Sequence, residues 1–191
     1  MLNHLKHYLT IVTLLLLFSS RSTHATVGFG TLVPAVGQYQ NDIDGGTTQV
    51  AINPYFAWNY LTQLSGNHYL LPEIGFAVHT GTEEEYTKIS YLLNVNLGWR
   101  FSPSGYLKYG LGTFITTISG EGETISLANG TETANFYAPQ EPAYSYQGAL
   151  NIGLLQFLRP HWALQVDLFA VRFLDSTKRS YSYLISVNFY H

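Results

Sequence analysis

The C-terminal segment alternates strictly between large apolar residues and mostly small or polar ones. Because successive side chains of a strand point to opposite faces, this period of two predicts a strand with one apolar, aromatic face. The apolar set is Tyr181, Tyr183, Ile185, Val187 and Phe189. A terminal strand of this kind, after many similar runs, favours a β-barrel in a bacterial outer membrane.

Similar alternation recurs along the chain in eight runs, each long enough to cross a membrane as a tilted strand of ~9–11 residues. No segment after residue 25 has a sustained helical period. The runs are 27–40, 48–60, 69–79, 86–101, 105–118, 143–157, 161–173 and 180–190. They predict an all-β, antiparallel up-and-down transmembrane barrel of about eight strands. Pro34, Pro54 and Pro72 lie inside these runs, and each predicts a bulge or a local break because proline cannot donate to a ladder.

The connectors differ in charge and in overall length. Every acidic residue except Glu73 and Asp167 lies in a connector that follows an odd run. These connectors are 41–47, 80–85, 119–142 and 174–179, whereas those after even runs are 61–68, 102–104 and 158–160. Barrels of this class have longer loops outside the cell, so we expect the odd connectors there. The composition of 119–142 indicates a mobile loop rather than a second domain.

The N-terminus resembles a secretory signal peptide. Lys6 precedes the apolar run 9–18, which is too short to span a bilayer as a helix, and polar residues follow it. Small residues at Thr23 and Ala25 predict cleavage after Ala25, which divides the chain into a signal peptide, 1–25, and a barrel domain, 26–191. Cleavage removes Lys6 and Arg21 from nine basic residues, and the remaining seven face twelve acidic ones. This balance argues against nucleic acid as a partner.

Composition indicates which face meets lipid. Charged residues are 11% of the chain, against ~25% in soluble domains, and the polar faces carry Asn, Gln, Ser and Gly. A soluble barrel would expose many more charges, so we expect the polar faces inside and the apolar faces toward lipid. The apolar faces end in aromatic residues that predict two interfacial girdles. These are Tyr60, Trp99, Phe101 and Trp162 near the even connectors, and Tyr86, Tyr144, Tyr146 and Tyr181 near the odd ones.

Together, the signal, the alternating strands, the acidic connectors and the final Tyr183, Ile185, Val187 and Phe189 pattern resemble the small outer-membrane β-barrel proteins, such as the OmpA transmembrane domain and OmpX. The resemblance implies a monomer in the outer membrane, in contact with lipid and lipopolysaccharide. It also implies insertion by the barrel assembly machinery, which recognises the last strand. Family members commonly finish on Phe, whereas Tyr190 and His191 follow Phe189 here.

Five charged residues fall on inward faces: Glu73, Lys88, Arg100, Lys108 and Asp167. A buried carboxylate must be paired or lose its charge, so we expect an interior network that includes Glu73, Arg100 and Lys108. One interpretation is a structural plug that fills the barrel. The alternative is a gate that opens a narrow ion path.

The remaining chemistry gives three hypotheses for function. The first is a structural or surface-interaction role through the outer loops, and the second is a narrow pore. The third is a lipid-modifying enzyme, for which His79 and Ser90 are a conceivable base and nucleophile.

No metal or nucleotide motif is found, and we expect no cofactor. The acidic run 83–85 is either a solvated loop or a site for a divalent cation with lipopolysaccharide. The sequence 129–131 matches a glycosylation acceptor, but it is more typical of a turn. The chain has no Cys, which excludes disulfides and thiol chemistry.

Overall fold

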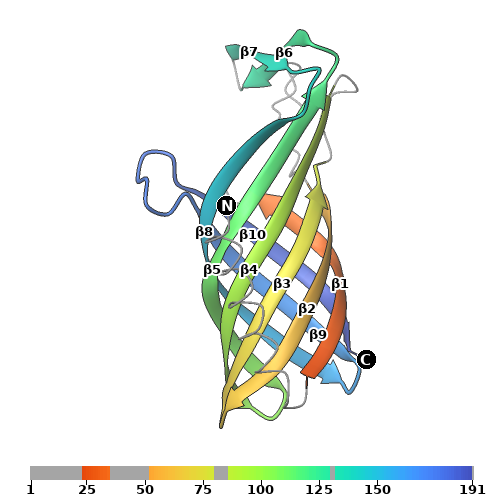
Figure 1. Cartoon of the computed structure of the whole chain (residues 1–191), viewed down its shortest axis with the longest axis vertical. Coiled ribbons are helices and arrows are strands. Elements are labelled where there is room, and N and C mark those ends of the chain that lie inside the picture. The colour runs from red at the N-terminus through yellow and green to blue at the C-terminus, as the bar shows by residue number, and fades with distance from the viewer. Residues whose placement is uncertain (1–22, 35–51, 80–85, 130–131, 191) are drawn as a thin grey trace, which may run out of the picture.

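The protein forms a closed barrel of eight antiparallel strands, with a separate two-stranded hairpin at one end (Figure 1). The computed structural model describes residues 23–34, 52–79, 86–129 and 132–190. The barrel strands are β1 (Thr23–Pro34), β2 (Asn53–Ser65), β3 (His68–Val78), β4 (Tyr86–Ser102), β5 (Gly105–Gly120), β8 (Ala143–Arg159), β9 (Trp162–Val171) and β10 (Ser180–Tyr190). The hairpin consists of β6 (Glu123–Asn129) and β7 (Glu132–Ala138). In the described parts of the chain, no helix has the length and apolarity needed to cross a membrane.

Each barrel strand pairs with the next barrel strand along the chain, and β10 pairs with β1 to close the cylinder. Phe29 of β1, for example, lies opposite Val187 of β10. The predicted all-β up-and-down barrel is therefore confirmed. The strand β1 begins at Thr23, and His24 and Ala25 pair with Leu61 and Tyr60 of β2. Cleavage after Ala25 stays a prediction, because most of the expected signal peptide lies outside the described residues.

The lower end of the barrel in Figure 1 carries the turns that follow β2, β4 and β8. The expected connector 61–68 is wrong: β2 continues to Ser65, and only Gly66 and Asn67 separate it from β3. Gly66 has a φ of 51°, which a glycine adopts without the steric cost that a side chain brings. The other two turns are 103–104 and 160–161, so every turn at this end has two residues.

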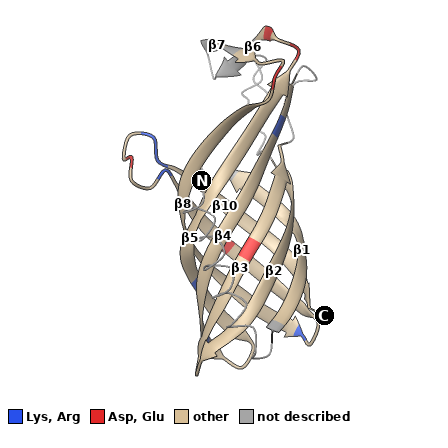
Figure 2. Ribbon diagram, in the orientation of Figure 1, with Lys and Arg blue, Asp and Glu red and all other residues tan. Residues whose placement is uncertain are grey.

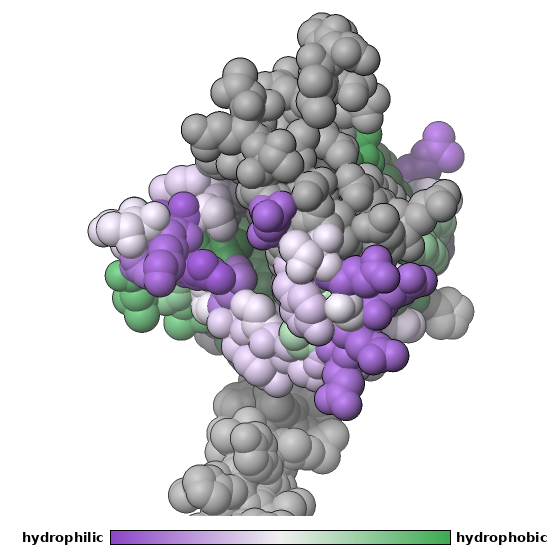
Figure 3. All heavy atoms as spheres, turned by 90° about the horizontal axis from the view of Figure 1, so that it is seen from above, coloured by the Kyte–Doolittle hydropathy of each residue, from purple (hydrophilic) through white to green (hydrophobic). Residues whose placement is uncertain are grey.

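The upper end is longer and uneven, because β4, β5 and β8 extend beyond the other strands. The segment 119–142 is not the structureless loop that its composition indicated. It contains the hairpin, in which Glu123 lies opposite Ala138 and Asn129 opposite Glu132. Seen from above, hydrophilic side chains gather on two sides of this end, and hydrophobic ones lie at its outer edge (Figure 3).

The three prolines affect pairing less than expected. Bulges or irregularities occur near the lower turns, at 63–65, 100–102 and 157–159, and not at a proline. Only Pro72 coincides with a break: the β2–β3 pairing stops after Asn59 and Glu73 and resumes at Thr62 and Leu70 in the same register. Pro34 and Pro54 lie at or next to strand ends, where a missing donor costs little.

Many charged residues lie toward the two ends of the barrel (Figure 2), and Glu73, Lys108 and Asp167 are buried in the interior and not on the outer wall. Large side chains such as Val95 (60% exposed), Leu111 (57%) and Ile152 (52%) project outward from adjacent strands. A band of exposed apolar side chains this wide is unfavourable in water and favourable in contact with lipid acyl chains. The two faces therefore have the expected assignment, and the fold is that of a transmembrane barrel.

Candidate functional site

The lumen is filled by three layers of side chains, two apolar and one polar. Along β10 the inward residues run from Tyr190 through Asn188 and Ser186 to Leu184, so a polar pair separates two apolar residues. The lower apolar layer is Leu61, Tyr69, Leu71, Tyr106, Leu155, Ala163 and Tyr190. The upper layer is Leu32, Tyr55, Ala57, Ala77, Leu92, Phe114, Ala149, Phe169, Val171 and Leu184. The polar layer is thus enclosed by hydrocarbon on both sides.

Lys108 is the centre of the polar layer. Its Nζ lies 3.1 Å from Glu73 Oε2 and 3.0 Å from Asp167 Oδ2, and all three side chains are almost completely buried. Tyr55 donates to Glu73 Oε1 at 2.7 Å, and Gln165 donates to Glu73 Oε2 at 2.9 Å and also to Asp167. These residues come from β2, β3, β5 and β9. The bonds of Lys108 and the bond from Gln165 to Glu73 join strands that are not neighbours in the sheet.

Amide side chains extend this layer. Asn188 donates to Gln165 Oε1 at 3.1 Å, and Asn59 donates to Asn188 at 3.0 Å. On the other side of the barrel Asn151 donates to Asn96 at 3.0 Å. Sequence reasoning missed Tyr55, Gln165 and the asparagines as site residues. The parity of each strand already places them inward, and that signal could have identified them.

The network has two carboxylates and one ammonium. Glu73 accepts from three donors, Tyr55, Lys108 and Gln165. Asp167 accepts through Oδ2 alone, and its buried Oδ1 has no partner among the described residues. Glu73 therefore has more hydrogen-bond donors than Asp167, and its negative charge is the better compensated of the two.

Two of the five residues expected in this network lie outside it. Arg100 sits beside the lower turn, where it donates to the carbonyl oxygens of Ser102 (3.2 Å) and Pro103 (2.7 Å). Its guanidinium lies 6.0 Å from the ring centre of Tyr106, a member of the lower apolar layer. Lys88 lies at the other end of β4, opposite Ile118 and beyond Leu92. Strand parity was right for both residues, but apolar layers separate them from the carboxylates.

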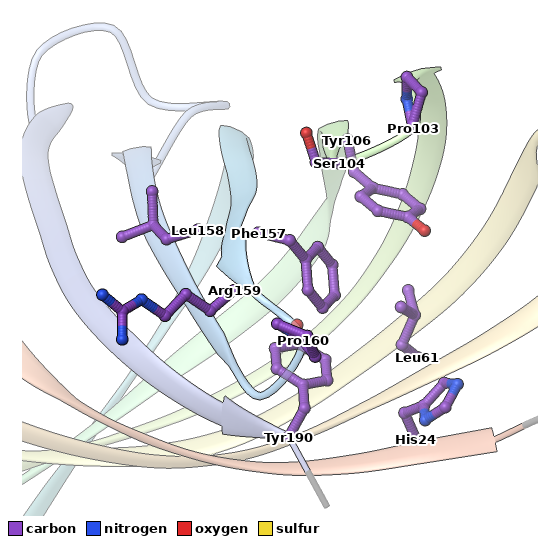
Figure 4. Close-up of a pocket in the computed structure, with 10 residues that line it drawn as sticks. All are labelled: His24, Leu61, Pro103, Ser104, Tyr106, Phe157, Leu158, Arg159, Pro160 and Tyr190. Carbon is purple, nitrogen blue, oxygen red and sulfur yellow. The ribbon is translucent and has the colours of Figure 1, made fainter.

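A hollow of about 440 Å³ opens at the lower mouth (Figure 4). Its floor is aromatic: the rings of Phe157 and Tyr190 are 4.4 Å apart, and those of Tyr106 and Phe157 are 5.7 Å apart. In Figure 4 the Arg159 side chain points away from these rings. The space between this floor and the polar layer is only about 10 Å³, about enough for one water molecule. The hollow therefore ends at the lower apolar layer.

Above the upper layer, His79 and Ser90 form the pair that the enzyme hypothesis named. His79 Nε2 lies 2.7 Å from Ser90 Oγ, and Ser90 Oγ lies 2.9 Å from Thr116 Oγ1. Burial, together with the positive charge of Lys88, lowers the pKa of His79 to about 4. The neutral imidazole is thus the form present at pH 7.

The surroundings of this pair are unlike those of a lipid-modifying centre. Ser90 is 4% exposed and faces the lumen, so an acyl chain in the bilayer does not reach its hydroxyl. In the described part of the chain no carboxylate bonds to His79, so the pair lacks the third group that orients the histidine in a Ser-His-Asp triad.

The girdle and assembly residues lie on the outer face. Seven of the girdle residues are exposed, and Tyr86 is half-buried; the seven are Tyr60, Trp99, Phe101, Trp162, Tyr144, Tyr146 and Tyr181. Tyr183, Ile185 and Phe189 of the final strand are exposed, and Val187 is half-buried. The acidic run 83–85 and residues 130–131 of the glycosylation match lie outside the described residues. Among the residues that are described, no group of acidic or histidine side chains could hold a metal ion.

Comparison with known proteins supports the fold. No protein-family model matches the sequence, and no curated protein is similar to it. The structure is similar to the crystal structure of Ail, the attachment invasion locus protein of Yersinia pestis (TM-score 0.52, 11% identity, 88% of this chain and 97% of that chain). It is also similar to Ail in complex with the heparin analogue sucrose octasulfate (0.52, 10%, 88% and 97%) and to Ail in a phospholipid bilayer nanodisc (0.50, 9%, 89% and 100%). At these identities the likeness shows the fold alone, which is that of the small eight-stranded outer-membrane barrels.

Proposed function

We propose that the protein is a non-conducting outer-membrane barrel with a structural or surface-interaction role at the outer end. The observation that carries the proposal is the filled lumen. An ion that crossed it would have to pass two apolar layers and break the bonds of Lys108 to Glu73 and Asp167. The pore hypothesis needs a hydrated path, and these layers argue against one.

The proposed orientation places the upper end outside the cell. The three lower turns have two residues each, whereas the upper end carries the longer connectors and the β6–β7 hairpin. Short periplasmic turns and long outer loops are typical of these barrels. In this orientation the upper ends of β4, β5 and β8 and the β6–β7 hairpin face the outside of the cell. Ail is named for attachment and invasion, and a related surface role for this chain belongs to the same proposal.

Conductance and attachment measurements test the two halves of the proposal. Purified protein in planar bilayers should give no discrete channel openings, and stable openings in the wild type would overturn the closed-lumen proposal. For the outer end, bacteria that express the wild-type chain are compared with bacteria in which 123–138 is replaced by a short Gly-Ser turn.

Two readouts separate a structural role from surface interaction. Loss of attachment to cultured epithelial cells in the replacement strain, with unchanged uptake of a hydrophobic dye, would support surface interaction. Increased dye uptake on deletion of the whole protein, with no change in attachment, would support the structural role. No change in either readout would overturn both roles.

A further inference from the structure

The connection between β9 and β10 concentrates positive charge. Its residues, 172–179, include Arg172, Lys178 and Arg179, which are three of the seven Lys and Arg residues after residue 25. Figure 1 shows this segment projecting sideways from the barrel wall, away from the β6–β7 hairpin. A loop that extends sideways from a membrane barrel has the lipid surface as its nearest neighbour.

The loop is held in shape by its own bonds. Asp175 Oδ1 accepts from the Thr177 hydroxyl at 2.7 Å and from the Thr177 amide at 3.1 Å. Arg179 Nη2 donates to the carbonyl oxygen of Phe173 at 2.9 Å. Within the described residues the salt bridges are those of Lys108, so none of the three basic residues of the loop forms a salt bridge there. Asp175 interacts electrostatically with Arg172, and the loop keeps an excess of two positive charges. This excess charge is available to an external anion.

The loop leaves the wall at the level of the upper aromatic girdle. The amide of Arg172 donates to the carbonyl oxygen of Gly148 at 2.7 Å, two residues from Tyr146, and Tyr181 is the second residue of the return strand β10. Tyr146 is 72% exposed, as expected where a barrel meets lipid headgroups. Leu174, two residues beyond Arg172, is 89% exposed, and a large apolar side chain of this kind gains free energy by entering hydrocarbon.

We propose that the 172–179 loop docks on the outer leaflet, with Leu174 among the acyl chains and Arg172, Lys178 and Arg179 bound to phosphate groups of anionic lipid. This inference rests on the proposed membrane location and orientation. Arginine donates to phosphate through a planar fork, and lysine adds a point charge. The acidic residues of the upper end, Glu121, Glu123 and Glu141, disfavour a soluble polyanion that approaches from above.

Fluorescence quenching tests the proposal in vesicles. Because the chain has no Cys, Ser176→Cys gives a single labelling site in the loop. The labelled protein is inserted into phosphatidylcholine vesicles that contain brominated phosphatidic acid or, in a parallel sample, brominated phosphatidylcholine at the same mole fraction. We expect stronger quenching by the phosphatidic acid, and the preference should weaken as salt rises.

Two variants and a second label sharpen the result. Each basic residue near an anionic surface contributes roughly fivefold in affinity, so Lys178→Gln with Arg179→Gln should remove most of the preference. Lys88→Gln, at the upper end of β4 and outside the loop, should leave it unchanged. A label at Ser65→Cys, the last residue of β2 and next to a lower turn, should report no preference in any variant.

The possible outcomes are distinguishable. Failure of the protein to insert into the vesicles, seen as full protease digestion, would overturn the proposed membrane location. Insertion with equal quenching by the two lipids would overturn the docking proposal alone. Protection of the loop from trypsin by inorganic phosphate or a heparin oligosaccharide, combined with equal quenching, would show that the loop binds a soluble anion and would also overturn it.

Discussion

The carboxylate of Asp167 occupies the space that a side chain at Gly153 would fill. A β-carbon built at Gly153 would overlap Asp167 Oδ1 and would lie 2.6 Å from the carbonyl oxygen of Val166. Gly153 and Asp167 lie opposite each other in the β8–β9 pairing. The glycine thus lets a buried carboxylate lie flat against the neighbouring strand and reach Lys108.

Gly153→Ala should therefore destabilise the barrel by about 1–3 kcal/mol, the usual cost of overpacking a filled interior. Gly148→Ala is a matched control on the same strand, because a β-carbon there would meet only Phe173 at 3.7 Å. Urea unfolding from vesicles measures both. Equal midpoints for the two variants would contradict the close approach of Asp167.

Removing the cation should cost more than removing one carboxylate. Lys108→Met leaves two buried carboxylates without a counter-ion, and breaking a buried pair in this way costs about 3–5 kcal/mol. Glu73→Gln should cost less, because Lys108 keeps Asp167 at 3.0 Å. Lys88→Met serves as a control outside the network. The reverse order of unfolding midpoints would show that the three residues do not act as one charge cluster.

A charged residue on the outer wall should cost more unfolding free energy near the middle of the bilayer than near its surface. Val166 lies mid-strand on the outer face, and Val166→Arg should cost about 2–4 kcal/mol in a bilayer. Leu158→Arg, beside a lower turn and 62% exposed, should cost about 0–1 kcal/mol because its charge lies near the interface. Equal losses of unfolding free energy for these two variants in vesicles would contradict the expectation that Val166 lies near the bilayer midplane and Leu158 near its surface. Gln165→Asn, next to Val166 on the inner face, would not serve as a neutral control, because Gln165 bonds to both Glu73 and Asp167.

Acid should weaken the outer mouth through His79. Its pKa is about 4 in the folded chain and ~6.5 when unfolded, so the unfolded state binds more protons between these values. Stability from this group is constant above about pH 6.5 and falls as the pH drops toward 4. The wild type should therefore lose stability relative to His79→Gln over that interval. A constant difference in unfolding free energy from pH 7.5 to 4.5 would contradict the buried, neutral imidazole.

The barrel was predictable because its signal is local. Alternation along 181–189 is read within one strand and does not depend on any partner. The β2–β3 turn was harder, because Leu61 and Thr62 are both buried beside the break at Pro72 and interrupt the alternation. The hairpin was missed because its apolar alternation is short. It consists of Ile125 and Leu127, which lie opposite Phe136 and Ala134, within a segment of otherwise polar composition.

The interior network was only partly predictable, for a geometric reason. Parity states which residues point inward, but the tilt of the strands decides which of them meet. In the sheet Lys108 lies opposite Gly98 and Gly153, whereas its charge partners are on β3 and β9. Arg100 shares its parity, yet it lies two residues nearer the turn and bonds to backbone there.

The hydrogen bond from Gln165 to Glu73 joins residues 92 positions apart on strands that are not neighbours in the sheet. It needs the sheet to curve until β3 and β9 face each other across the lumen. Until then Glu73 and Asp167 either stay in water or lack some of their donors, so a half-wound sheet gains little from burying them. The network thus couples early strands of the chain to late ones, and we expect contacts of such long sequence separation to slow the formation of the barrel.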